Sequence, residues 1–106
     1  GRTASVLTIR TGATLMELKW TSKALSDLAR LYDFLVLASK PAAARTIQSL
    51  TQAPVILLTH PRMGEQLFQF EPREVRRIFA GEYEIRYELN GQTIYVLRLW
   101  HTRENR

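Results

Sequence analysis

Arginine and aromatic residues gather in the last third of this chain, and their side chains suit the binding of phosphate or carboxylate groups. Of the 15 basic residues, 12 are arginine, and seven of these lie between Glu71 and Arg106. Arginine is favoured where planar, bidentate contact with such anions is needed. The alternative for each arginine is a salt bridge to a nearby glutamate on a solvated face. We predict a target-binding surface made of Arg73, Arg77, Arg86, Arg98, Trp100, His101 and Arg103.

Two residues could add proton transfer to this surface. Cleavage of RNA through a 2′-hydroxyl needs a base, an acid, and cations that stabilise the pentacoordinate phosphate. Glu65 is a candidate base and His101 a candidate acid, with the arginines as the cations. In the competing interpretation, His101 is a surface residue, and Trp100 is a core residue, a stacking platform or an anchor for a partner.

Composition excludes several other classes of site. The chain has no cysteine, which rules out disulfides and thiolate chemistry and fits a reducing cytoplasm. With two histidines and no cysteine, we expect no metal site, and no cofactor is expected either. The sequence has no glycine loop that would cradle phosphate and no serine hydrolase elbow. No apolar run reaches the roughly 18 residues that span a bilayer, so no membrane partner is expected.

The elements that must position these residues begin with two strands over residues 80–106. The register of this hairpin depends on the loop at Asn90-Gly91. A two-residue turn would place charged residues beside Leu97 and Leu99, whereas a three-residue loop with Gly91 in the left-handed conformation separates core from charge, so we expect the latter. The expected core face holds Tyr83, Ile85, Tyr87, Tyr95, Leu97 and Leu99. The opposite face holds Glu82, Glu84, Arg86, Val96, Arg98 and Trp100.

Two helices are predicted upstream of the hairpin. Residues 16–20 alternate like a short strand, and Thr21-Ser22 supplies a helix cap. Apolar residues then recur at helical spacing over 22–39. Pro41 suits the first turn of a second helix, which we expect to kink or pause at Pro54. The short connection makes the two helices an antiparallel hairpin.

The rest of the chain reads as short strands. Residues 66–70 should be extended, and residues 73–79 should lead into the Ala80-Gly81 turn. At 106 residues the chain makes one domain. The predicted fold class is α+β in two layers: an N-terminal strand, a helical hairpin, then a three- to four-stranded antiparallel sheet. The helices cover one sheet face, so the other should be open and rich in arginine.

Residues 1–15 differ in pattern from the other residues of the chain. They lack a periodic apolar face, so we expect them to be a non-native or upstream extension, with residues 16–106 forming the domain. The alternative is a genuine strand at residues 5–9, paired on a sheet edge.

Several short motifs occur along the chain in a characteristic order. They are Trp20-x-x-x-Ala24-x-x-Asp27-Leu28, Pro61-x-Met63-Gly64, Arg73-Glu74-Val75-Arg76, Tyr83-Glu84-Ile85-Arg86-Tyr87 and Val96-Leu97-Arg98-Leu99-Trp100-His101-Thr102-Arg103. Their order and spacing resemble the RelE/ParE superfamily of type II toxins over Met16 to Arg106. The resemblance implies a plasmid-stabilisation-type toxin. A co-encoded antitoxin would neutralise it by wrapping an extended segment or helix over the toxin.

The resemblance implies two possible targets. RelE-like and YoeB-like members cleave mRNA in the ribosomal A site, whereas ParE-like members poison DNA gyrase. Glu65 and His101 match the nuclease base and C-terminal histidine, but the catalytic arginine position falls on Glu84 and the terminal tyrosine position on Thr102. Arg86 is the neighbouring replacement for that arginine.

The catalytic candidates, if the chain is a nuclease, are therefore Glu65, Arg86 and His101. The ending His101-x-Arg103 looks instead like ParE. We expect a cytoplasmic, ParE-like gyrase inhibitor with a cognate antitoxin as its partner. The alternative is a RelE-like, ribosome-dependent mRNA endonuclease, and only that alternative would make the chain an enzyme.

Overall fold

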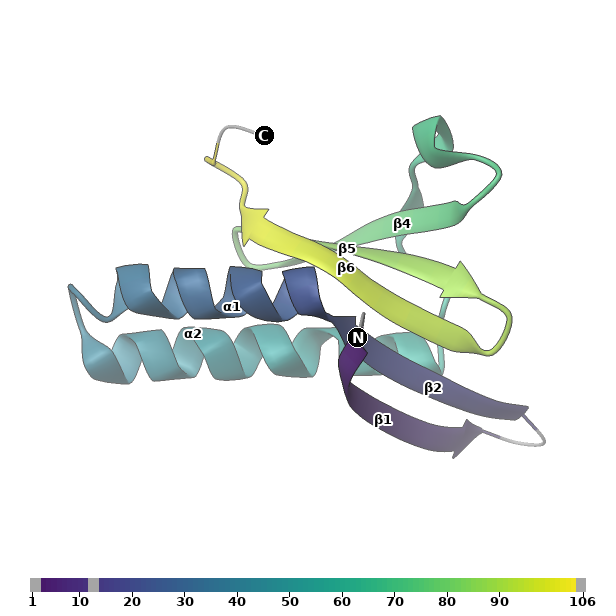
Figure 1. The fold of residues 1–106 in the computed structure, drawn as a ribbon, viewed down its shortest axis with the longest axis horizontal. Coiled ribbons are helices and arrows are strands. Elements are labelled where there is room, and N and C mark those ends of the chain that lie inside the picture. Colours follow the sequence, from purple (N-terminus) through teal and green to yellow (C-terminus); the bar gives the residue numbers. More distant parts are fainter. Residues whose placement is uncertain (1–2, 12–13, 105–106) are drawn as a thin grey trace.

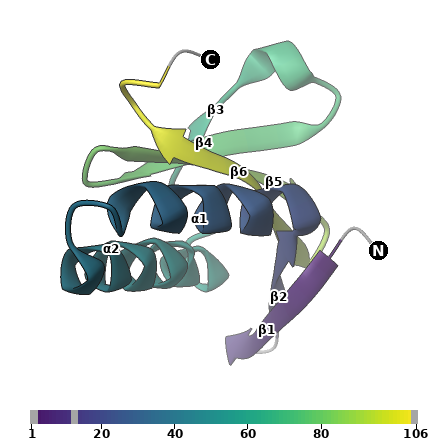
Figure 2. The same ribbon diagram turned by 60° about the vertical axis from the view of Figure 1, so that its left-hand side comes forward.

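A six-stranded sheet in the order β1-β2-β6-β5-β4-β3 organises the computed structural model of the chain, which describes residues 3–11 and 14–104 (Figure 1). The strands are β1 (Thr3–Thr11), β2 (Thr14–Thr21), β3 (Glu65–Gln66), β4 (Glu74–Ala80), β5 (Tyr83–Asn90) and β6 (Thr93–His101). Helices α1 (Ser22–Leu35) and α2 (Lys40–Gln52) form the predicted hairpin and lie against one side of β4–β6 (Figures 1 and 2). The predicted α+β fold and its four antiparallel strands, β3 to β6, are confirmed. Because β2 runs parallel to β6, the whole sheet is mixed.

Polar caps set the start of both helices. The Thr21 hydroxyl accepts a hydrogen bond from the Ala24 amide, and Ser39 does the same for Ala42. Pro41 lies in the first turn of α2, as predicted. Helix α1 ends at Leu35, before the predicted residue 39. The reason is that the Leu37 and Ala38 amides bond three residues back and Ser39 adopts the extended backbone that a cap requires.

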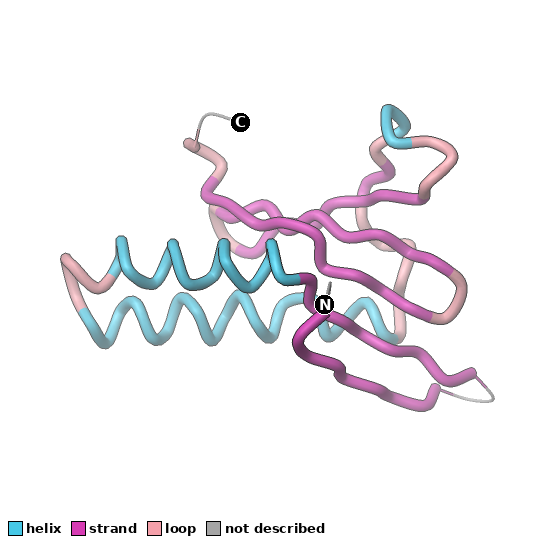
Figure 3. The backbone as a smooth tube through the Cα atoms, viewed as in Figure 1, coloured by secondary structure: helices cyan, strands magenta, loops and turns pink. Residues whose placement is uncertain are grey.

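Pro54 interrupts the second helix as predicted. Helix α2 ends at Gln52, and the chain continues as a 3₁₀ helix, η1 (Ala53–Leu58), with the proline in its first turn. Pro54 and Leu57 remain buried in this arrangement. The buried positions of the second helix therefore continue through the change of helix type. Figure 3 draws both α2 and η1 as helix.

The main core lies between the helical hairpin and one face of the sheet. Leu18 of β2 and Leu50 of α2 are each 1% exposed and belong to one cluster with strand residues that are fully buried. These strand residues are Ile85, Tyr87, Ile94, Val96 and Leu99. Close packing against the helices therefore fixes the position of β5 and β6.

The register of the β5–β6 hairpin differs from both alternatives derived from the sequence. The loop is two residues, Gly91–Gln92, between the paired residues Asn90 and Thr93, and Gly91 has the expected positive φ of 62°. A bulge with Leu97 as its extra residue then shifts the pairing. Beyond the bulge, Arg86 pairs with Arg98. The two residues share a face, as predicted, although the predicted register placed a glutamate opposite Arg98.

Before the bulge, the predicted faces are wrong. Val96 is fully buried in the core instead of joining Arg98 and Trp100. Tyr95 pairs with Glu88 on the opposite face, and Leu97 lines a groove there. The physical reason is that a bulge changes parity partway along a strand, so one register cannot describe both halves.

The segment between β3 and β4 crosses the sheet face away from the helices (Figure 2). The predicted extended segment 66–70 is wrong beyond Gln66, because the chain turns into a short 3₁₀ helix, η2 (Phe68–Phe70). Leu67 and Val75 are buried outside the main core cluster. The face predicted to be open is therefore partly covered by this segment.

Strand β1 pairs with β2 at one edge of the sheet. It includes residues 5–9, which the sequence offered as an alternative edge strand. That residues 1–15 are a non-native or upstream extension stays a prediction.

Candidate functional site

One row of the sheet brings the predicted basic residues together. Arg77 of β4 pairs with Arg86 of β5, and Arg86 pairs with Arg98 of β6. Glu65 of β3 is next to Arg77 in the same row. Side chains in such a row point to the same face of a sheet. The face away from the helices therefore carries the arginines, as the sequence predicted.

Each of these arginines is held by a carboxylate, and most of the carboxylates lie beneath. Arg73 bonds Glu88 at 2.8 Å, with side chains 50% and 11% exposed respectively. Arg86 bonds Glu84 at 3.0 Å, and their side chains are 23% and 9% exposed. Arg98 bonds Asp27 at 2.8 Å, and their side chains are 35% and 6% exposed. Hydrogen bonds to these acids raise the pKa of Arg73 and of Arg98. The salt-bridge interpretation and the binding-surface interpretation thus describe the same residues, since Arg73 and Arg98 are each fixed by a less exposed acid and keep part of their own side chains exposed.

Arg86 occupies the centre of this surface. Its guanidinium carbon lies 4.8 Å from the ring centre of Trp100 and 5.4 Å from that of Phe70, distances typical of cation–π contacts. Its Nε is buried and, in the described part of the chain, has no hydrogen-bond partner. Trp100 is itself only 7% exposed. The tryptophan is therefore the support beneath Arg86.

Asp27 joins helix α1 to strand β6 and is not among the site residues that the sequence predicts. It accepts two hydrogen bonds from Arg98, at 2.8 and 3.1 Å, and one from the Leu99 amide at 3.0 Å. The sequence does contain a signal, because Asp27 lies on the same helical stripe as Ala24, Leu28 and Leu31. An acid on a buried stripe requires a cationic or hydrogen-bonding partner.

A groove of about 740 Å³ opens beside the start of α1. It is lined by residues 21–23, Phe70, Arg73, Arg86, Leu97 and Arg98. Lys23 is exposed, and no carboxylate of the described residues forms an ion pair with it. Sequence reasoning misses Lys23 and Phe70 because they come from segments far from the arginine-rich strands.

His101 lies apart from this groove. It pairs with Tyr83. Because it is two residues after Leu99 on the same strand, it lies on the same side of the sheet as Leu99, which is the helix side. Its ring packs edge-on against Tyr83 at 5.1 Å, and its Nδ1 accepts a hydrogen bond from the Arg103 amide. Burial raises the pKa of Tyr83, with the nearby charges of Glu104 and Glu82 adding to the effect.

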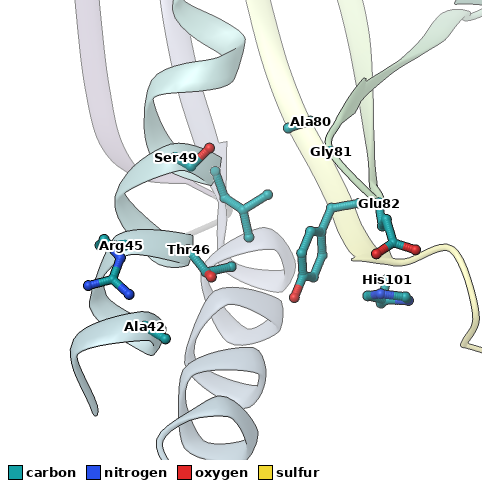
Figure 4. A pocket seen from close by; sticks show the side chains of 10 residues that line it. Ala42, Arg45, Thr46, Ser49, Ala80, Gly81, Glu82 and His101 are labelled. Carbon is teal, nitrogen blue, oxygen red and sulfur yellow. The ribbon is translucent and has the colours of Figure 1, made fainter. Parts of the chain in front are cut away.

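A second pocket, of about 420 Å³, is lined on one side by His101 (Figure 4). Arg45, Thr46 and Ser49 of α2 form one side of it, and Glu82 and His101 form the other. Figure 4 shows that this pocket opens between the helix and the β4–β5 turn. It contains none of the arginines of the sheet row.

The three nuclease candidates therefore do not converge. Glu65 and Arg86 belong to the arginine face, and the Glu65 carboxylate is bonded to Arg77 at 2.9 Å. His101 is on the other face, in the second pocket. Arg103 is exposed near His101 and away from the row.

The segment Pro61–Gly64 is clasped by two strand residues. The Tyr87 hydroxyl donates to the Pro61 carbonyl at 2.8 Å and accepts from the Gly64 amide at 3.1 Å. Arg76 donates to the Gly64 carbonyl at 2.7 Å. Burial raises the pKa of Tyr87. This clasp fixes the start of β3 and hence the position of Glu65.

Two further properties concern residues 3–11 and 14–104. They contain no group of three or more histidine, aspartate or glutamate residues placed to hold a metal ion. None of their helices is long and apolar enough to cross a membrane.

Comparison with known proteins adds a family and a structural relative. Residues 18–106 match the profile described as the ParE toxin of the type II toxin–antitoxin system parDE. No curated protein matches the chain significantly. A solved structure described as the chromosomal ParDE TA system from P. aeruginosa is similar, with a TM-score of 0.69 and 27% sequence identity. The similarity covers 81% of this chain and 95% of the other.

Proposed function

This chain belongs to the ParE toxin family of type II toxin–antitoxin systems, and on that premise we propose that it poisons DNA gyrase and is kept inactive by a cognate antitoxin. The observation that carries the proposal is the match to the ParE profile over residues 18–106. Gyrase acts on DNA in the cytoplasm, so the toxin acts there. A toxin of this kind stabilises the plasmid or chromosomal locus that encodes it.

The geometry of the nuclease candidates supports a non-enzymatic toxin. General acid–base cleavage needs the base, the acid and the phosphate within hydrogen-bond reach of one another. Here Glu65 is paired with Arg77 and His101 is on the opposite sheet face. Arg86, the replacement arginine, is held between two rings and bonded to Glu84.

The antitoxin is the partner that the family implies. The similar structure from P. aeruginosa is described as a ParDE system. An acidic segment would complement the arginine face, because the exposed guanidinium groups are held toward solvent above their carboxylates.

Induction of the toxin without its antitoxin tests the proposal. Cells should filament and mount an SOS response, and purified gyrase should accumulate cleaved DNA complexes in the presence of the toxin. Supercoiling by gyrase should fall in the same reaction. Immediate arrest of translation with intact DNA, and mRNA cut in the ribosomal A site, would instead establish the endonuclease alternative.

A further inference from the structure

We propose that the groove beside the start of α1 binds the phosphodiester backbone of a single nucleic-acid strand, with Lys23 and Arg73 near the phosphate and Phe70 beneath a base. The inference deepens the proposed function, on which the choice of DNA as the natural strand rests. It makes the toxin a direct contact of the DNA that gyrase holds. The groove is separate from the His101 pocket.

The charge of the groove supports an anionic ligand. Arg73 and Arg98 keep 50% and 35% of their side chains exposed, while their partners Glu88 and Asp27 are only 11% and 6% exposed. Lys23 adds a further cation that lacks an ion pair within the described residues. The positive end of α1, a helix of 14 residues, lies at the same place. At the surface of the groove the cations are therefore more accessible to a ligand than the carboxylates that pair with them.

One residue that lines the groove has an unmet hydrogen-bond donor. Arg86 lines the groove, and its Nε is buried without a hydrogen-bond partner among the described residues. Buried donors without a partner are uncommon in native proteins and call for an explanation. A shift of the Arg86 side chain toward the groove would let a phosphate oxygen accept a charge-assisted bond from this nitrogen.

The aromatic ring distinguishes a nucleic acid from an acidic peptide. Phe70 is half-buried, lines the groove and stacks on the Arg86 guanidinium. Proteins that bind single strands combine a positive groove with aromatic rings on which bases stack. Aspartate and glutamate side chains have no aromatic ring to stack on Phe70. The combination therefore favours a nucleotide chain as the ligand of the groove, and an antitoxin segment laid over the arginine face would compete with it.

A pair of matched charge reversals tests the phosphate contact. Lys23 and Lys40 are both exposed lysines in the first turn of a helix, where glutamate is favourable, so K23E and K40E change charge equally and neither should unfold the chain. Binding of a fluorescent single-stranded DNA would be followed by anisotropy over a range of salt concentrations. K23E should weaken binding about tenfold and lower the salt slope by about one, while K40E stays within about twofold.

A pair of phenylalanine variants tests the base contact. F70L should weaken DNA binding about fivefold with the salt slope unchanged, because stacking releases no counterions. F68L is the control, since Phe68 is 64% exposed and does not line the groove. Circular dichroism melting of all four variants confirms that each remains folded.

The test separates the inference from the proposed function, because the binding reaction contains no gyrase. Equal losses for K23E and K40E, or for F70L and F68L, would overturn the groove as the site. So would a polyglutamate peptide that displaces the DNA at lower concentration than unlabelled DNA does. RNA of the same sequence, run in parallel, identifies which strand binds more tightly, and a preference for RNA contradicts the assignment of DNA. A toxin that binds DNA in this way yet leaves gyrase unaffected would refute the proposed function alone.

Discussion

Asp27 has three simultaneous bonds, to two guanidinium nitrogens and one backbone amide, from a position that is 4% exposed. The D27A variant should lose about 3 kcal/mol of stability, since it leaves Arg98 and the Leu99 amide without their acceptor. D27N should lose less, because its amide oxygen still accepts. Urea denaturation measures both, with D33N on the exposed side of α1 as the control. A D27A loss no larger than that of D33N would contradict this account.

Glu74 makes stability depend on pH. Its burial favours the neutral acid, but hydrogen bonds from Arg62 and Arg76 outweigh this and lower the pKa of Glu74 below its ordinary 4.5. The unfolded chain therefore binds this proton more tightly than the folded chain does. The stabilisation is complete above the ordinary pKa and is lost as the pH falls through the lowered value.

The E74Q variant should therefore lose less of its stability than the natural chain when the pH falls below 4.5. Denaturation curves collected between neutral and acidic pH provide the measurement. E71Q removes an exposed acid that forms no ion pair with the described residues, and it is the control for the loss of one carboxylate. Parallel curves for E74Q and the natural chain would show that Glu74 is not the titrating group.

Residue roles are only partly predictable from the sequence. The row of Arg77, Arg86 and Arg98 follows from alternation along neighbouring strands. Phe70 and Lys23 do not, because their approach to that row depends on how η2 and α1 pack, which no periodicity records. The sequence groups His101 with the arginines because it follows Trp100, yet alternation after the bulge places it on the opposite face.

At the scale of elements, two glycines support turns for different physical reasons. Gly91 has a positive φ of 62° with nothing within 4 Å of an added Cβ, so G91A should cost about 1 kcal/mol from backbone strain. Gly64 has an added Cβ only 2.6 Å from the Arg77 carbonyl oxygen and 2.7 Å from the Tyr87 hydroxyl. G64A should therefore lower the free energy of unfolding by about 3 kcal/mol or more, because the segment at Gly64 must move away from Arg77 and Tyr87 to make room for the methyl group.

Urea denaturation of the two variants, with G81A as a second exposed turn, checks this difference. Gly81 resembles Gly91 in having a positive φ and open space, so the two should lose similar stability. Equal losses of stability for G64A and G91A would show that the contact between Gly64 and Tyr87 adjusts to the added methyl group without further destabilisation.

Most elements are predictable because their local signals agree. Thr21, Ser39, Pro41 and Pro54 each mark a helix boundary by the hydrogen bonds they make or prevent. The bulge at Leu97 is not predictable, since it arises where β2 ceases to pair with β6 and α1 takes its place. The short β3 is also beyond local signals, because the clasp by Tyr87 fixes it from a distant part of the chain.

For the whole molecule, the place of residues 1–15 is open to experiment. The family match begins at residue 18, whereas β1 pairs with β2 along most of its length. A chain that starts at Met16 should still fold and remain toxic, because the core of β2, β5, β6 and the helices is intact. Circular dichroism melting and growth assays on both forms provide the comparison. Loss of cooperative melting in the shorter form would make β1 an integral strand of the domain.

The contact between Asp27 and the Leu99 amide also occupies a backbone donor in the second half of β6. Strand β2 pairs with β6 only as far as Val96, so the rest of β6 would be an open edge on which another chain could add a strand. Helix α1 covers this edge with the Asp27 carboxylate, which accepts the hydrogen bond of the Leu99 amide. A carboxylate has no N–H group, so it cannot continue the backbone pairing of the sheet. We therefore expect variants that remove the Asp27 carboxylate to self-associate more readily than the natural chain, because the Leu99 amide would then be free to pair with another strand.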